Sequence, residues 1–107
     1  MQTTRTASLL FTMLLLAISA ARAQNGGDIA AGHTLAREVC SACHAIERGD
    51  RQSRRSEAPS FEAVRETPGM TETALYAFFQ TSHRNMPNIV LDPTQIRDVT
   101  AYIMQLK

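Results

Sequence analysis

Apolar residues recur at helical spacing in three segments of the chain: before residue 40, over 71–81 and after residue 92. The first segment follows Asp28, a residue type that caps helix N-termini, and runs up to a pair of cysteines. The second follows the helix-breaking pair Pro68-Gly69. The apolar faces consist of Ile29, Leu35, Ala36 and Val39 in the first segment, and of Leu75, Phe78 and Phe79 in the second.

The third segment has the clearest helix start. Asp92 suits the N-cap, Pro93 the first helical position, and Gln95 completes a capping box. No stretch alternates long enough to predict a strand, and the polar, arginine-rich stretch 47–59 is typical of a surface loop. We therefore expect an all-α fold with three main helices and irregular loops. The stripe of the last helix consists of Ile96, Val99, Thr100, Ile103 and Leu106.

The first 23 residues have the organisation of a secretory signal peptide. A basic start at Arg5 precedes a short apolar run over 9–18, and Ala21-Arg22-Ala23 is a small-x-small cleavage pattern. A retained membrane anchor is the alternative, but a span needs roughly 20 apolar residues and this run has about half as many. We predict a signal peptide at 1–23, cleavage before Gln24, a periplasmic location and a mature domain at 24–107 without a membrane span.

Composition limits the function classes. The chain has 107 residues, 11 Lys and Arg and 10 Asp and Glu, so its formal charge of +1 gives no indication of nucleic-acid binding. A domain this small buries a limited core and usually needs reinforcement by disulfides, a metal or a large cofactor.

Cys40-Ser41-Ala42-Cys43-His44 has the spacing for covalent attachment of a c-type haem. Both thiols can form thioethers to the haem, and His44 can be an axial ligand of the iron. Three alternatives use the same residues. A thioredoxin-like redox pair would need a preceding strand, a zinc site would need two of His33, His44 and His83 as further ligands, and a plain disulfide would leave the adjoining histidine unexplained.

The second axial ligand decides between an electron carrier and an open haem site. Met86 is the leading candidate because it lies in a polar loop between two predicted helices and precedes Pro87, which stiffens the turn. His83 is a rival that would give bis-histidine ligation, and Met70 also lies in a loop. Met104 falls inside the last helix and is interpreted as apolar filler.

With CSACH, a later Met-Pro and a terminal Ala101-Tyr102-Ile103, the chain resembles a small bacterial class I cytochrome c. The resemblance covers the whole mature chain and implies one covalently bound haem. It also implies that the first and last helices cross at Gly32 and Tyr102. The segment 58–61 resembles the Gly-Pro-x-Leu segment of the family, so the Pro59 carbonyl is expected to accept a hydrogen bond from His44. Ala58 and Phe61 depart from that pattern, which bears on packing rather than on ligands.

We expect an apolar wall around the haem, made by Phe61, Leu75, Phe79, Ile89 and Leu91. Arg51, Arg54 and Arg55 have three interpretations that the sequence leaves open: contacts to haem propionates, a solvated loop, or a patch for an acidic redox partner.

The function implied is transfer of single electrons between redox proteins, by a monomer or by a subunit of a redox complex, without a substrate and so without enzymatic activity. The alternatives are an electron-transfer subunit of a dehydrogenase or oxidase, and an open-site haem enzyme or sensor.

Overall fold

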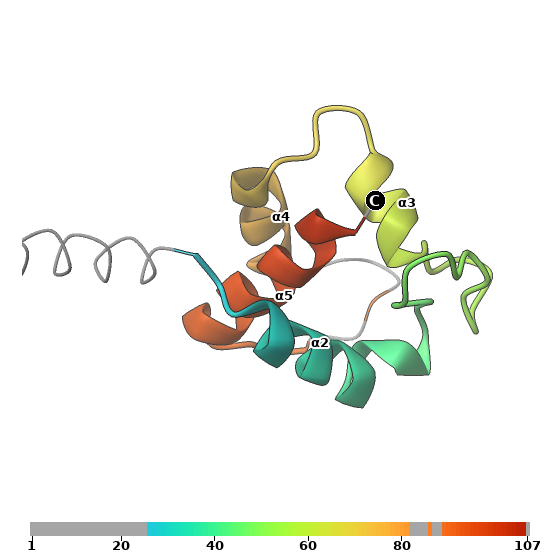
Figure 1. Cartoon of the computed structure of the whole chain (residues 1–107), viewed down its shortest axis with the longest axis horizontal. Coiled ribbons are helices and arrows are strands. Elements are labelled where there is room, and N and C mark those ends of the chain that lie inside the picture. Colours follow the sequence, from blue (N-terminus) through green and yellow to red (C-terminus); the bar gives the residue numbers. More distant parts are fainter. Residues whose placement is uncertain (1–25, 82–85, 87–88, 107) are drawn as a thin grey trace, which may run out of the picture.

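The computed structural model describes residues 26–81, 86 and 89–106, and these contain helices but no strand. The order along the chain is α2 (Ile29–Glu38), a 3-10 turn η1 (Cys40–Ala42), α3 (Phe61–Glu66), α4 (Glu72–Phe79) and α5 (Pro93–Gln105). Figure 1 shows α5 running across α2, with α3 and α4 toward the other side of α5. The all-α fold expected from the sequence is confirmed, and the three predicted helices correspond to α2, α4 and α5.

The crossing of α2 and α5 is the most extensive contact between helices. It depends on Gly32, where a Cβ atom would overlap the backbone carbonyl of Asp98 and lie 3.0 Å from the Tyr102 Cβ. The side chain of Asp98 also accepts a hydrogen bond from the Asp28 backbone N–H, at 2.8 Å, at the start of α2. The glycine thus allows two helix backbones to approach each other, as the resemblance implied.

Helix α5 begins as the sequence predicts and ends with help from elsewhere. The Asp92 carboxylate accepts from the Thr94 and Gln95 backbone N–H groups, and the Gln95 side chain completes the capping box. The last turn of α5 contains no basic residue of its own. Arg65 instead donates from Nε to the Met104 carbonyl at 2.9 Å, and Arg48 from Nη2 to the Gln105 carbonyl at 3.3 Å. Two arginines therefore stabilise the negative end of the helix dipole.

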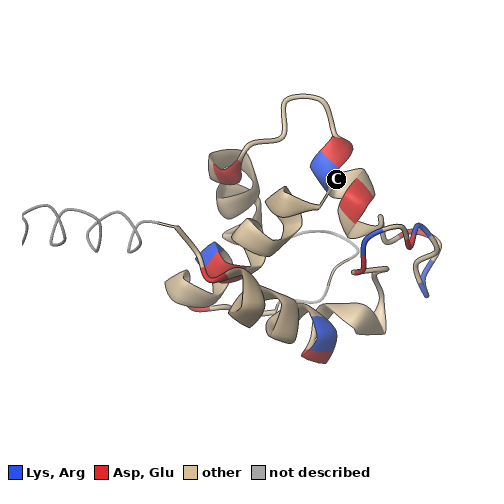
Figure 2. Cartoon of the chain, viewed as in Figure 1, with Lys and Arg blue, Asp and Glu red and all other residues tan. Residues whose placement is uncertain are grey.

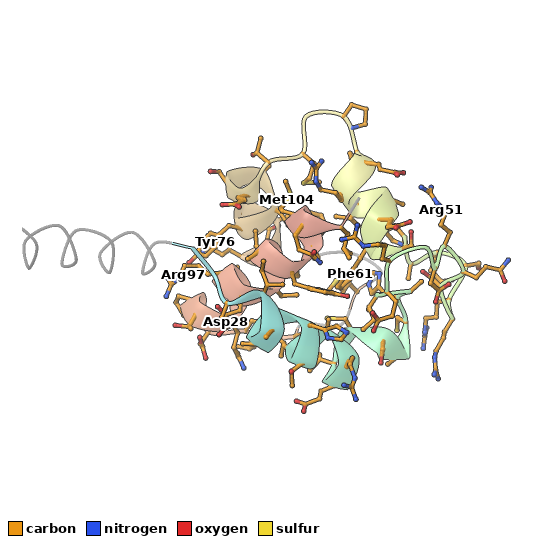
Figure 3. All side chains as sticks on the ribbon, viewed as in Figure 1. Asp28, Arg51, Phe61, Tyr76, Arg97 and Met104 are labelled. Carbon is orange, nitrogen blue, oxygen red and sulfur yellow. The ribbon has the colours of Figure 1, made fainter. Side chains whose placement is uncertain are left out.

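The short helix α3 was not predicted. Ser60 caps it, accepting from the Ala63 backbone N–H at 3.1 Å, with Glu62 in its first turn and Arg65 in its last. Its first residue, Phe61, is buried and projects into the interior (Figure 3). The main hydrophobic core joins this ring to residues from α2, η1, α4 and α5, to Ile46 after η1 and to Leu106 at the end of α5. Its members are Ala36, Cys40, Ile46, Phe61, Leu75, Val99, Tyr102, Ile103 and Leu106.

Helix α4 starts after Thr71, whose hydroxyl accepts from the Ala74 backbone N–H at 3.1 Å. It ends at Phe79, two residues before the end of the expected segment 71–81. None of the helices in the described part of the chain is both long and apolar enough to cross a membrane.

Candidate haem-attachment site

The Cys-x-x-Cys-His segment lies directly after α2, where η1 tightens the chain into a turn. The Cys43 and His44 backbone N–H groups both donate to the Cys40 carbonyl, at 3.1 and 2.9 Å. Cys40 is buried and Cys43 half-buried, and the two thiols are free rather than joined in a disulfide. The local fold thus presents two unpaired thiols and one imidazole from five consecutive residues.

Burial distinguishes the two thiols. Removal from water raises the pKa of the Cys40 thiol to about 11, because the charged thiolate is poorly solvated there. Cys40 therefore stays protonated at neutral pH, packed in the core.

His44 is held by two neighbours from the opposite side of the loop. Its Nδ1 lies 2.7 Å from the Pro59 carbonyl oxygen, which is an acceptor only, so Nδ1 carries the proton. Its ring faces that of Phe61 at a centroid distance of 5.6 Å. With Nδ1 occupied as a donor, Nε2 is the nitrogen left to coordinate a metal.

Four of the five apolar residues expected around the haem belong to one apolar cluster or pack against it. Phe61 and Leu75 belong to the same buried cluster as Cys40, and Phe79 packs against it half-buried. Leu91 also packs against the cluster, whereas Ile89 is half-buried in the segment before α5. The apolar residues expected around the haem thus largely belong to the cluster that contains the first attachment cysteine, or pack against it.

The remaining ligand candidates have different positions. Met86 is half-buried in the bend between α4 and α5, and its neighbours His83 and Pro87 lie outside the described residues, as does the predicted signal peptide. Met70 and Met104 both pack, partly buried, against the core cluster. This packing agrees with the interpretation of Met104 as apolar filler, and Met70 packs in the same way.

A zinc site of the kind considered from the sequence is not visible in the described part of the chain, where no three His, Cys, Asp or Glu side chains gather to hold a metal ion. His33 instead lies with Nε2 2.8 Å from a carboxylate oxygen of Glu47.

The arginine-rich loop is balanced by acidic residues. Arg51 projects from the loop beside α3 (Figure 3), and its Nη2 lies 2.7 Å from Glu66 Oε1 while its Nε lies 3.5 Å from Glu62 Oε2. Arg55 lies 3.9 Å from Glu57. Figure 2 shows both signs of charge over this loop and α3. A polar hollow of about 540 Å³ adjoins it, lined by Arg51, Gln52, Ser53, Arg55, Ser56, Ala58, Pro59, Ser60 and Ala63.

Sequence reasoning missed two polar contacts to the segment that follows His44. The Tyr102 hydroxyl donates to the Ile46 carbonyl at 2.8 Å, and the Glu62 carboxylate accepts from the Gly49 backbone N–H at 2.7 Å. Each contact joins residues far apart in the chain, so no local spacing signals it. A glutamate in a first helical turn is usually solvated, and only the packing of α3 buries Glu62.

The donor set suits a c-type haem: two free thiols at the attachment spacing, an imidazole with its second nitrogen available, and an adjoining apolar cluster. The profile of the family described as "Cytochrome C oxidase, cbb3-type, subunit III" matches residues 27–103. The chain belongs to this cytochrome c family. As a member it carries a haem c, covalently attached through the cysteine pair Cys40 and Cys43, and functions in haem-based electron transfer.

The chain is also similar to a curated cytochrome over most of its length. Cytochrome c-552 of Bradyrhizobium diazoefficiens is 28% identical over 95 residues, which are 89% of this chain and 90% of that protein. No solved structure matches the chain.

Proposed function

We propose that this cytochrome is a periplasmic electron carrier whose iron has His44 and Met86 as axial ligands and which catalyses no reaction of its own. The observation that carries the proposal is the hydrogen bond from His44 Nδ1 to the Pro59 carbonyl. It fixes the tautomer and the orientation of the imidazole, and it leaves Nε2 available as a strong donor. The haem supplies a single exchangeable electron when bound.

The chain's own residues have separate roles in this proposal. Cys40 and Cys43 anchor the cofactor, and Pro59 holds His44. Phe61, Leu75 and Phe79 exclude water from the cofactor, which favours the less charged, reduced state. Met86 offers a neutral sulfur from a half-buried position, which also favours the reduced state. We further propose that residues 1–23 direct export and are removed before Gln24.

The test is the visible spectrum of the purified protein, oxidised and reduced, with the variants Met86→Ala and Met70→Ala. We expect a c-type spectrum with the weak far-red band of sulfur-ligated ferric haem, lost in Met86→Ala and kept in Met70→Ala. Loss of the band in Met70→Ala alone would transfer the role to Met70. Absence of the band in the wild type, with spectral changes in His83→Gln, would favour bis-histidine ligation. Carbon monoxide binding by the reduced wild type at neutral pH would favour an open-site enzyme or sensor.

A second candidate is supported by the family description, which names a subunit of an oxidase. In that role the same electron transfer takes place inside a complex. The name of the curated relative, cytochrome c-552, mentions no complex. Size determination after gentle extraction from the native host distinguishes the two: a monomer supports the free carrier, and co-elution with a catalytic redox protein supports the subunit.

A further inference from the structure

The segments 44–49 and 59–62, which include the two ends of the arginine-rich loop, are joined by three hydrogen bonds. His44 Nδ1 donates to the Pro59 carbonyl at 2.7 Å, and the Phe61 backbone N–H donates to the Ala45 carbonyl at 2.9 Å. The third is the bond from the Gly49 backbone N–H to Glu62 Oε1 at 2.7 Å. The segment 59–62 is thus bonded to the first two residues of the segment 44–49 and to its last residue.

Pro59 and Phe61 form their bonds with backbone atoms, whereas Glu62 forms its bond with its side chain. It is 6% exposed, and a buried carboxylate costs free energy unless it is paired and hydrogen-bonded. Both of its oxygens are used: Oε1 by the Gly49 N–H and Oε2 by Arg51 Nε, 3.5 Å away. Because Arg51 is 60% exposed at its side chain, the shorter bond to Gly49 fixes the carboxylate more firmly than the ion pair does.

The partner of Glu62 lies in a tight turn. The Asp50 backbone N–H donates to the Glu47 carbonyl at 3.2 Å, and Gly49, at the third position, has a φ of 78°. This backbone conformation suits glycine and puts the Gly49 N–H at a defined place. From the same turn, Glu47 reaches His33 and Arg48 reaches the end of α5. Fixing the turn therefore fixes the chain that leaves His44.

We propose that Glu62 is a positioning residue for His44, acting through the Gly49 turn. The inference rests on the proposed role of His44 as an axial ligand. Glu62 does not touch His44; it follows Phe61, whose ring faces the imidazole, and it holds the far end of the segment that begins at His44. Without the bond between Glu62 and Gly49, the plane of the His44 imidazole turns relative to Pro59. The strength of His44 Nε2 as an iron ligand then changes.

The experiment uses the haem-loaded protein and separates the effect of side-chain length at position 62 from the effect of its charge. In Glu62→Asp the charge remains, but the side chain is about 1.5 Å shorter and cannot reach the Gly49 N–H. In Glu62→Gln the charge is lost, but an oxygen of the same reach remains. Glu66→Gln is the control, because Glu66 pairs with the same arginine and is half exposed. The measured quantities are the haem-methyl NMR shifts of the ferric protein, which depend on the orientation of the axial imidazole, and the midpoint potential.

We expect Glu62→Asp to change the methyl pattern and to alter the ferric-to-ferrous ratio at a fixed applied potential at least twofold, which is about 18 mV at 59 mV per tenfold. Glu62→Gln and Glu66→Gln keep the wild-type methyl pattern. If Glu62→Gln changes the pattern as Glu62→Asp does, or if neither changes it, Glu62 does not position His44.

A second pair of variants tests the other side of the bond, by changing Gly49 instead of Glu62. Gly49→Ala places a side chain on a residue with a positive φ, which strains the backbone, although the new Cβ would contact nothing within 4 Å. Gly69→Ala is the matched control, because Gly69 lies between α3 and α4 with a φ of 80° and an equally open Cβ position. Gly49→Ala should reproduce the pattern of Glu62→Asp, and Gly69→Ala should not. Equal patterns in the two glycine variants contradict the inference. A wild type without histidine-ligated haem would instead refute the proposed function, so the two failures are distinct.

Discussion

The Tyr102 hydroxyl donates a 2.8 Å hydrogen bond to the carbonyl oxygen of Ile46, and so joins α5 to the chain just after His44. The Tyr102 ring is near two other rings, with centroid distances of 4.9 Å to His33 and 6.4 Å to Phe61. One side chain of the terminal helix therefore contacts α2, α3 and the segment that follows the attachment motif. The crossing helices and the candidate site are a single packed unit.

Removing this hydroxyl should destabilise the protein. In Tyr102→Phe the buried Ile46 carbonyl loses its donor, which costs about 1–3 kcal/mol in the free energy of unfolding. Denaturant titration of the holoprotein measures this loss. The control is Tyr76→Phe on α4, where the tyrosine is half-buried and none of the hydrogen bonds of the described residues uses its hydroxyl. Equal effects of the two substitutions would contradict the role assigned to the Tyr102 bond.

Tyr102 should also make stability fall at alkaline pH. Burial first, and then the charge and hydrogen bonding of Glu47, raise the pKa of Tyr102 to about 12 in the folded protein. The pKa of a tyrosine in the unfolded chain is about 10, so between about pH 10 and 12 the unfolded state binds fewer protons than the folded state. The free energy of unfolding therefore decreases as pH rises through this window. Denaturation at pH 9, 10 and 11 should show a shallower decrease in Tyr102→Phe; parallel curves for wild type and variant would refute the assignment.

The fold elements that sequence predicts well are those whose signals are local. The capping box of α5 and the Asp28 cap of α2 lie within four residues of the helices they start, and both are confirmed. Helix α3 escaped prediction because it has only six residues and owes its place to Phe61 in the core and to Arg65 on the end of α5. Packing, rather than helix propensity, determines such a short helix.

The same distinction applies to the site. The attachment motif is contiguous, so the sequence predicts the haem from local spacing, and the family match confirms it. The hydrogen bond from His44 to Pro59 spans 15 residues and was expected only through the family resemblance. Glu62 and Gly49 are 13 residues apart and belong to no motif, so their contact required the structure.

The close approach of α2 and α5 should be sensitive to a single methyl group. In Gly32→Ala the new Cβ meets the Asp98 carbonyl, and backbone atoms cannot move aside without separating the helices. The better helix propensity of alanine gains only about 1 kcal/mol, whereas overpacking of this kind costs about 1–3 kcal/mol or more. We expect net destabilisation in thermal unfolding. Gly26→Ala, where a Cβ contacts nothing within 4 Å, is the matched control and should change little; a Gly32→Ala protein as stable as wild type would show that the crossing can relax.

The two attachment thiols should differ in reactivity before the haem is joined to them. The sample is the reduced, haem-free chain, with its helical fold checked by circular dichroism. Because the pKa of the Cys40 thiol is raised to about 11, only about a thousandth of it is thiolate at pH 8. The core also shields the Cys40 side chain from the reagent. Cys43 is half-buried and more accessible. Iodoacetamide labelling followed by peptide mass analysis should modify Cys43 at least tenfold faster. In urea the two rates should converge, because the difference arises from folding; equal rates in the folded chain would mean that Cys40 is not buried before attachment. In the holoprotein neither cysteine should react, since both sulfurs are then thioethers.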